Sequence, residues 1–157
     1  MRIVLIFALC HALFAWSEVH PAVLAVVVPA QEDVEKLKLT PNSLKLIYLR
    51  KQLYWPNGKR IVPVNLQSEH VLRNQFSLAL LGTLPKQQID YWNGLYFNGI
   101  QPPHTVNSEE AVLRFISETK GAIGYVNACA VDERVKALLW IEGNTITTQP
   151  ISLVCPH

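Results

Sequence analysis

Apolar residues follow two different spacings along the chain, and these spacings predict both strands and helices. Residues 23–28 read VLAVVV, a continuous and largely β-branched apolar run that ends at Pro29. Such a run is typical of a strand that is buried on both faces of a sheet. Shorter runs predict four more strands, at residues 61–64, 122–126, 136–141 and 151–155. Because Pro63 cannot donate a ladder hydrogen bond, we expect the first of these four to lie at a sheet edge or to end there.

Helical spacing of apolar residues separates these strands. Thr40 and Pro41 favour a helix start, because a threonine hydroxyl can accept from the free N–H groups and proline fits the first turn. We expect this helix to run to Trp55, the residue before Pro56. Its buried stripe would consist of Leu46, Leu49 and Leu53.

Three more helices follow from the same spacing, together with a loop at residues 93–103. They are expected at residues 69–81, directly after Pro85, and at residues 107–119. Their buried residues would be Leu72, Phe76 and Leu80, then Ile89 and Trp92, then Val112, Phe115, Ile116 and Thr119. Gly82 would end the first of them, and Asn107 with Glu110 would form a capping box at the last. The alternation of strands and helices predicts an α/β or α+β domain over residues 18–157.

One glycine precedes the predicted strand at residues 122–126, and a second lies inside it. Gly121 follows a predicted helix and would end it in a left-handed conformation. Gly124 would let the strand approach a neighbouring element closely. Both glycines are therefore expected to serve the fold rather than a ligand.

The first seventeen residues, MRIVLIFALCHALFAWS, have the pattern of a secretory signal peptide. Arg2 provides a positive start, an apolar run follows, and the small residues near Ser17 suit cleavage before Glu18. A membrane anchor or a buried strand is the alternative, but the run is short for a spanning helix, which needs about 20 apolar residues. We expect export to the periplasm without stable membrane insertion.

Export would leave two of the three cysteines. Cys10 lies in the predicted signal peptide, and Cys129 and Cys155 remain. In an oxidising compartment we expect these two to form a disulfide. It would close a loop of about 25 residues and stabilise the fold by about 3 kcal/mol. Two buried thiols are the alternative.

The charge balance and the motifs argue against several function classes. Without Arg2 the chain carries 13 Lys and Arg against 12 Asp and Glu, which gives no basis for binding nucleic acid or an anionic membrane. No nucleophile elbow, phosphate-binding Gly-Lys-Ser loop or HExxH helix is present. The histidines outside the signal peptide lack metal-ligand spacing: His20, His70, His104 and His157. We expect no enzymatic activity, cofactor or metal.

Polar residues gather at the start of the predicted helix at 69–81. Ser68 would lie at the helix N-terminus, where free N–H groups can bind an anion, and Arg73 follows one turn later. These two are the candidate ligand-binding residues. The alternative without a ligand is that Ser68 caps the helix and Arg73 pairs with Glu69.

Six aromatic residues allow a second interpretation. A platform that stacks on sugars or bases is one reading, and packing in the core and at its rim is the other. The six residues are Tyr54, Trp55, Tyr91, Trp92, Tyr96 and Phe97.

Several short segments occur in a distinctive order between residues 23 and 141. They are LIYLRK at 46–51, WPNG at 55–58, IVPV at 61–64, Arg73 with Phe76, YW at 91–92, FNG at 97–99, PP at 102–103 and GAIGY at 121–125. In this order they resemble the substrate-binding proteins of phosphate ABC transporters, which belong to the type II periplasmic binding proteins. They resemble most the short stand-alone members in Gram-negative bacteria.

The resemblance implies both a fold and a function. Family members have two α/β lobes that close on a ligand, and a chain of this length corresponds to a single lobe with a mixed sheet flanked by helices. The implied ligand is phosphate or another small oxyanion. The family's Ser-Gly-Thr turn is absent from residues 65–73, and Arg50 stands where the family often has glycine. Ser68 and Arg73 are the remaining residues of suitable chemistry, so we expect weak binding.

A different function follows from the same single lobe. The face that meets the second lobe in family members would here be free for a protein partner or for a second copy of the chain. Such a face should be more apolar than an ordinary monomer surface. The rival hypothesis is therefore a periplasmic interaction or sensory module that has lost its ligand.

Overall fold

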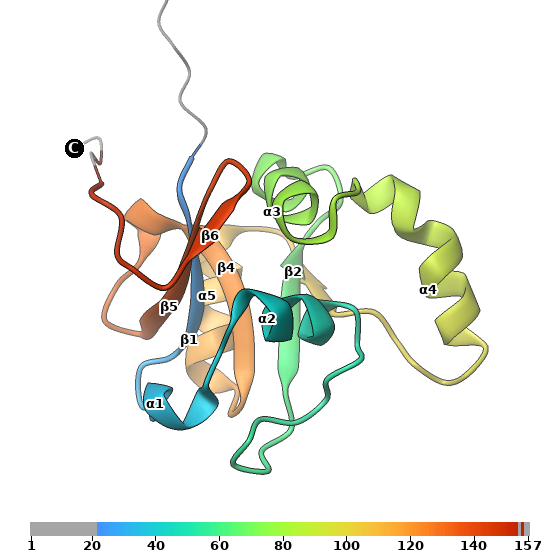
Figure 1. The fold of residues 1–157 in the computed structure, drawn as a ribbon, viewed down its shortest axis with the longest axis horizontal. Coiled ribbons are helices and arrows are strands. Elements are labelled where there is room, and N and C mark those ends of the chain that lie inside the picture. The colour runs from blue at the N-terminus through green and yellow to red at the C-terminus, as the bar shows by residue number, and fades with distance from the viewer. Residues whose placement is uncertain (1–21, 154, 156–157) are drawn as a thin grey trace, which may run out of the picture.

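A single mixed sheet organises the chain in the computed structural model, which describes residues 22–153 and 155 (Figure 1). The signal peptide predicted at residues 1–17 lies outside the described residues. The strands are β1 Leu24–Pro29, β2 Val62–Leu66, β3 His104–Val106, β4 Ala122–Asn127, β5 Val135–Glu142 and β6 Thr145–Thr147. Their order in the sheet is β3-β2-β4-β1-β5-β6. The predicted α/β class and mixed sheet are confirmed.

Strand β1 is buried along its whole length and lies inside the sheet. It pairs antiparallel with β4 on one side and with β5 on the other. All six of its residues are buried, as the continuous apolar run predicts. β2 runs parallel to both β3 and β4, so the parallel and antiparallel halves of the sheet meet at β4.

Helices cover both faces of this sheet. They are α1 Val34–Leu37, α2 Pro41–Tyr48, α3 Val71–Leu81, α4 Ile89–Tyr96 and α5 Glu109–Glu118, with short 3₁₀ turns at Pro85–Gln88 and Ala128–Ala130. Figure 1 shows α5 behind the sheet and α2 and α3 in front of it. Within the described residues, none of these helices has the length and apolar character needed to cross a bilayer.

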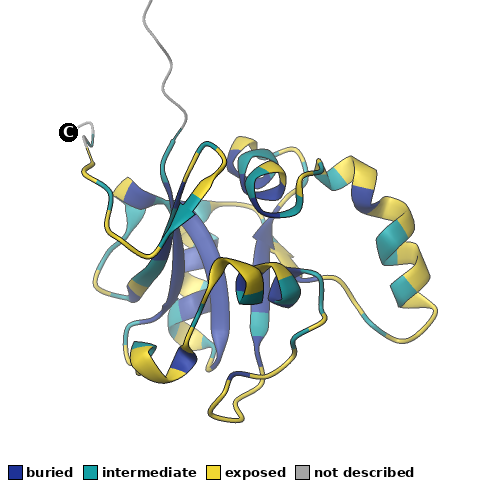
Figure 2. Ribbon diagram, viewed as in Figure 1, coloured by how far each residue is buried: buried dark blue, intermediate teal, exposed yellow. Residues whose placement is uncertain are grey.

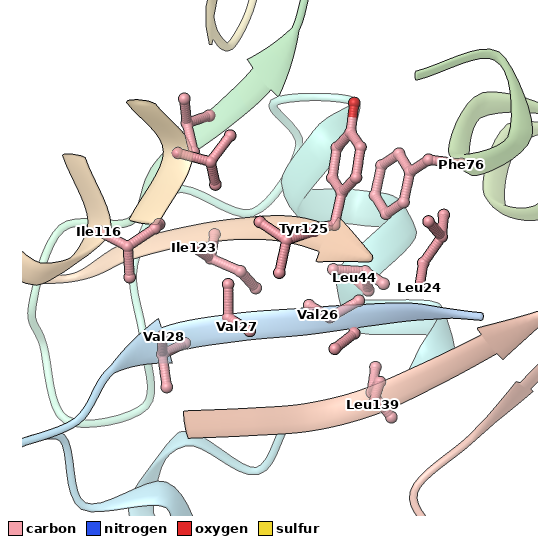
Figure 3. Packing of buried hydrophobic residues seen from close by; sticks show 14 of the residues in the cluster. Leu24, Val26, Val27, Val28, Leu44, Phe76, Ile116, Ile123, Tyr125 and Leu139 are labelled. Carbon is pink, nitrogen blue, oxygen red and sulfur yellow. The ribbon is translucent and has the colours of Figure 1, made fainter. Parts of the chain in front are cut away.

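Neighbouring residues of β4 face the two helical layers in turn. Gly124 lies against Val112 and Ile116 of α5. Tyr125, the next residue, points the opposite way and stacks on Phe76 of α3 with 3.8 Å between the ring centroids (Figure 3). This alternation follows from the two-residue period of a strand, and it makes β4 the centre of both halves of the core.

The N-terminus of α2 follows the prediction, whereas its C-terminus does not. Thr40 caps the helix in a capping box with Ser43, and Pro41 is its first residue. The expected continuation to Trp55 is wrong, because the helix ends at Tyr48 and Arg50 adopts a left-handed backbone with φ +57°.

The expected buried stripe of α2 is wrong for the same reason. Its buried residues are Leu44, Ile47 and Tyr48, because only these face the sheet within the short helix. Leu46 and Leu49 are half-buried, and Leu53 is exposed.

Strand β2 is not an edge strand, which corrects the expectation drawn from Pro63. β4 pairs with β2 at Val62 and Pro63, whereas the pairing with β3 starts only at Val64. The proline therefore lies in the stretch that precedes the β3 ladder. A three-residue strand such as β3 has too weak an apolar pattern to be predicted, although it is what makes β2 an interior strand.

Helix α4 stands apart from the body of the protein. The predicted loop at residues 93–103 is wrong in its first part, since the helix continues to Tyr96. None of its residues is buried, and Figure 2 shows it largely in the colours of exposed and intermediate residues. The expected apolar side formed by Ile89 and Trp92 does not enter the core: Ile89 is 56% exposed.

The C-terminal part differs from the prediction in two details. The N-cap of α5 is Ser108, whose hydroxyl accepts from the N–H of Ala111, so the capping box of Asn107 and Glu110 is wrong by one residue. The last strand is β6, and the described residues of the expected strand at 151–155 have no strand structure. The predicted disulfide between Cys129 and Cys155 is present, with 5.6 Å between their Cα atoms.

Gly121 directly before β4 and Gly124 within it both allow close contacts. Gly121 is left-handed at φ +76°, as expected, but α5 already ends at Glu118 with Thr119 as its C-cap, so the glycine lies beyond the cap. A Cβ on Gly121 would lie 2.2 Å from the carbonyl oxygen of Arg60. A Cβ on Gly124 would lie 2.7 Å from Cγ1 of Val64 and 2.9 Å from Cγ1 of Val112. The close packing predicted for Gly124 is confirmed.

We predict that Gly124→Ala destabilises the protein by about 1–3 kcal/mol, because the added methyl group overpacks the junction of β2, β4 and α5. Urea unfolding of the two proteins would measure the difference. Gly94→Ala on α4 is the matched control, since an added Cβ there would meet no atom within 4 Å beyond its own helical backbone and chain neighbours. The control should be neutral or stabilising by up to about 1 kcal/mol. Equal effects of the two substitutions would contradict the packing described for β4.

Candidate functional site

The two predicted ligand-binding residues line one cavity. This cavity has a volume of about 360 Å³ and lies where β2 ends and α3 begins. Ser68 and Arg73 line it, together with Trp92, Pro102 and Pro103. The fold therefore brings the predicted pair together at the C-terminal end of a parallel strand, where α/β sheets commonly bind ligands.

Arg73 is buried without an acidic partner. The residue is 8% exposed, and its Nη1 donates a hydrogen bond to Oδ1 of Asn65. No carboxylate of the described residues forms an ion pair with it. A buried positive charge is costly unless hydrogen bonds or an anion compensate it. The guanidinium has five donors, so donors remain for an anion in the cavity.

A small polar network fixes the position of Asn65. The hydroxyl of Tyr125 donates to Oδ1 of Asn65 over 3.3 Å, and it accepts from the N–H of Leu66 over 3.3 Å. The same amide oxygen accepts from Arg73. These bonds join β2, β4 and α3, so the guanidinium is held in one orientation at the cavity wall.

The interpretation without a ligand is wrong in both of its parts. Helix α3 begins at Val71, and its cap is His70, whose Nδ1 accepts from the N–H of Leu72 over 3.2 Å. Ser68 lies before the cap and donates instead to the carboxylate of Glu69 over 2.6 Å. Glu69 is outside the helix, so the i,i+4 geometry with Arg73 does not arise.

Glu69 is the one acidic residue among those that line this cavity in the described part of the chain. The hydrogen bond from Ser68 lowers the pKa of Glu69, so its carboxylate stays charged at neutral pH. A negative charge beside the cavity opposes the binding of an anion. Ser68 is the only donor to this carboxylate among the described side chains, and an anion would compete with Glu69 for it.

The six aromatic residues do not form a single exposed platform. Trp55 is buried, and its Nε1 donates to the carbonyl of Gly121 over 3.1 Å. Tyr91 donates to the carbonyl of Leu49 over 2.7 Å. Trp92 lines the cavity. The other three are exposed: Tyr54, Tyr96 and Phe97.

Two residues of the site were not predicted. Asn65 interrupts an otherwise apolar strand, VPVNL, and this interruption is the signal that could have identified it. Tyr125 gives no comparable signal, because its hydroxyl meets Asn65 only through the pairing of β2 with β4. Within the described part of the chain, no three His, Cys, Asp or Glu side chains are grouped so that they could hold a metal ion.

We predict that the protein loses stability at alkaline pH through Tyr125. Burial is the main cause that raises its pKa from 10.0 to about 12, partly offset by the charge of Arg73. The folded state therefore favours the neutral phenol. The preference for the neutral phenol contributes roughly 2 kcal/mol to the free energy of unfolding. This contribution is fully present below pH 10 and is lost as the pH rises through 12.

Urea unfolding of the wild type and of Tyr125→Phe between pH 9 and 11.5 would test this prediction. The variant should be less stable at pH 9 by about 1–3 kcal/mol, because the buried N–H of Leu66 loses its acceptor. Between pH 9 and pH 11.5, the free energy of unfolding of the variant should fall by less than that of the wild type. Parallel pH profiles would show that Tyr125 does not titrate with unfolding.

Comparison with solved structures identifies the fold. The chain is similar to an ABC-type phosphate transport receptor from Vibrio cholerae, with a TM-score of 0.56, 21% identity and coverage of 74% of this chain and 46% of that one. A putative phosphate ABC transporter substrate-binding protein from Clostridium perfringens, solved with bound phosphate, gives a TM-score of 0.59, 21% identity and coverage of 76% and 46%. PstS from Borrelia burgdorferi gives a TM-score of 0.56 and 17% identity, with coverage of 83% of this chain and 50% of that one.

Sequence comparisons add nothing to this assignment, since no family model and no curated protein matches the chain. The chain spans about half the length of the solved structures that it resembles. The six-stranded mixed sheet with helices on both faces therefore has the fold of about half of a phosphate-binding protein.

Proposed function

We propose that this protein binds phosphate or another small oxyanion, without catalysing a reaction, through Ser68 and Arg73. The observation that carries the proposal is the burial of Arg73 at a cavity wall with no acidic partner among the described residues. An oxyanion in the cavity would accept from the remaining guanidinium donors. Arginine is well suited to this, because its planar fork matches two oxygens of a phosphate.

Two further observations support this ligand class. The cavity lies at the N-terminus of α3, an eleven-residue helix whose dipole favours a negative charge there. The solved structures with the same fold include one that contains phosphate. That likeness supports the choice of phosphate as the first ligand to test.

The affinity should be low. The cavity is open to solvent, so a bound anion would keep part of its hydration. Hydrogen bonds that compete with water contribute only about 0.5–1.5 kcal/mol each. Together with the charge of Glu69, this indicates a dissociation constant on the order of 1 mM.

We also propose that the protein is exported to the periplasm as a single domain covering residues 18–157. The disulfide between Cys129 and Cys155 supports an oxidising compartment. The apolar start of the chain supports a signal peptide.

Calorimetric titration of residues 18–157 with phosphate and sulfate tests the site. We predict saturable binding that weakens at least tenfold in Arg73→Gln, with an intermediate loss in Arg73→Lys, which keeps the charge without the fork. Arg114→Gln is the matched control, since Arg114 is exposed on α5 away from the cavity. Unfolding midpoints would show that the variants are folded. Absence of heat at millimolar ligand, or unchanged binding by folded Arg73→Gln, would contradict the proposal.

A second prediction concerns the repulsion by Glu69. Removing its charge should tighten sulfate binding about fivefold, which corresponds to about 1 kcal/mol for a partly screened charge pair. Glu69→Gln and the control Glu118→Gln on α5 would be compared in the same titration. If both substitutions had the same effect, Glu69 would not face the bound anion.

A second function, an interaction module, is favoured by the surface of α4. This helix has no buried residue, and Ile89, Tyr96 and Phe97 are exposed, Phe97 by 87%. The partner that we propose to test is a second copy of the chain. The reason is that the solved structures carry about as much chain again beyond the part that matches.

We predict that a dimer formed through α4 would dissociate in Phe97→Asp. Sedimentation velocity at several protein concentrations would test this. The sedimentation coefficient of the wild type should rise with concentration, and that of the variant should not. Val71→Asp, on an exposed position of α3, is the control. If the wild type stayed monomeric at high concentration, a second copy of the chain would not be the partner of α4.

A further inference from the structure

A second and larger cavity lies at the other end of β2. Its volume is about 450 Å³, and it is formed where β2 starts, between the segment that follows α2 and the segment that precedes β3. Arg50 and Arg60 line it, together with Leu53, Val62, Ile100 and Pro102. No Asp or Glu of the described residues lines it. The cavity therefore combines two positive charges with apolar walls.

The two arginines have no acidic partner within residues 22–153. Nε of Arg50 is buried and has no hydrogen-bond acceptor among the described residues. Arg50 and Arg60 line the same cavity, and burial, followed by the charge of Arg60, lowers the pKa of Arg50. An anion between them would relieve the repulsion and accept from the unused donors.

The backbone of Arg50 supports a role for its side chain. It has φ +57°, and it is one of two described non-glycine residues with a positive φ. A residue with a Cβ is strained in this conformation, and glycine is the usual choice. An arginine in this conformation is a backbone outlier, and such outliers are grounds for inferring a functional role.

We propose that this cavity binds a small organic anion. Arg50 and Arg60 hold its carboxylate or phosphate group, and its apolar part lies against Leu53, Val62 and Ile100. The volume falls in the range of small-molecule sites, and a few polar groups on apolar walls are typical of them. This ligand differs from the inorganic oxyanion proposed for Ser68 and Arg73, which lie at the opposite end of β2. The two cavities share Pro102 and Pro103 in their walls.

Titration of residues 18–157 followed by NMR would test the proposal, with benzoate, phenyl phosphate and neutral benzamide as probes. We expect saturable shifts at the residues that line the cavity for one or both anions, and at least tenfold weaker binding of benzamide. A preference for benzoate or for phenyl phosphate identifies the head group. Equal binding of benzamide, or no saturable shift with either anion up to 20 mM, would overturn the proposal.

Substitutions distinguish a ligand-binding role of Arg50 from a purely structural one. Arg50→Gly removes the guanidinium and relieves the strained backbone, so its unfolding midpoint should be equal to the wild type or up to about 5 °C higher. Its binding of the organic anion should fall at least tenfold, as should that of Arg60→Gln. Lys51→Gln, which removes a neighbouring exposed charge, should bind within twofold of the wild type.

The site at Ser68 and Arg73 provides the last control. Ser68→Ala should bind the organic anion as the wild type does, so failure of the oxyanion site would leave this proposal intact. If folded Arg50→Gly and Arg60→Gln retained binding, or if Ser68→Ala abolished it, the organic anion would not lie between Arg50 and Arg60.

Discussion

The hydrogen bonds of the Tyr125 hydroxyl hold together the part of the molecule on which the candidate site depends. This hydroxyl lies in the core beside Phe76, yet it bonds to the backbone of Leu66 and to the side chain of Asn65. Through Asn65 it also determines where the guanidinium of Arg73 lies. The hydrogen bonds of this network are buried, and burial makes each of them more costly to break. Core packing and the polarity of the site are therefore parts of one arrangement.

Features that depend on adjacent residues were predictable from the sequence. The burial of β1 follows from its continuous apolar run, the start of α2 follows from Thr40 and Pro41, and the close approach at Gly124 follows from the missing side chain. Features that depend on distant pairing were not. β3 and β6 have three residues each and exist because β2 and β5 offer them a partner. The end of α2 depends on the left-handed backbone of Arg50, for which an arginine gives no signal.

The candidate site shows the same division. Ser68 and Arg73 were found from residue chemistry and from their position near a helix start, and the fold does bring them to one cavity. Their bonding partners could not be predicted, because His70 rather than Ser68 caps the helix and because Asn65 and Tyr125 lie on different strands. The helical spacing of α3 places Arg73 on the same buried face as Phe76 and Leu80. A charged residue on a buried face requires a compensating group, and this requirement is the physical basis of the proposed function.

Two anion sites are proposed, one at each end of β2: the first for a small inorganic anion and the second for a larger organic one. The central claim is that an oxyanion is bound by the guanidinium of Arg73, and an NMR titration that follows the arginine side-chain Nε–H signals tests it most directly. The account predicts that phosphate at millimolar concentration shifts the Arg73 signal and the backbone amide of Ser68 along one saturation curve. A saturable shift confined to other arginines, or no shift of Arg73 at saturating phosphate, would contradict it.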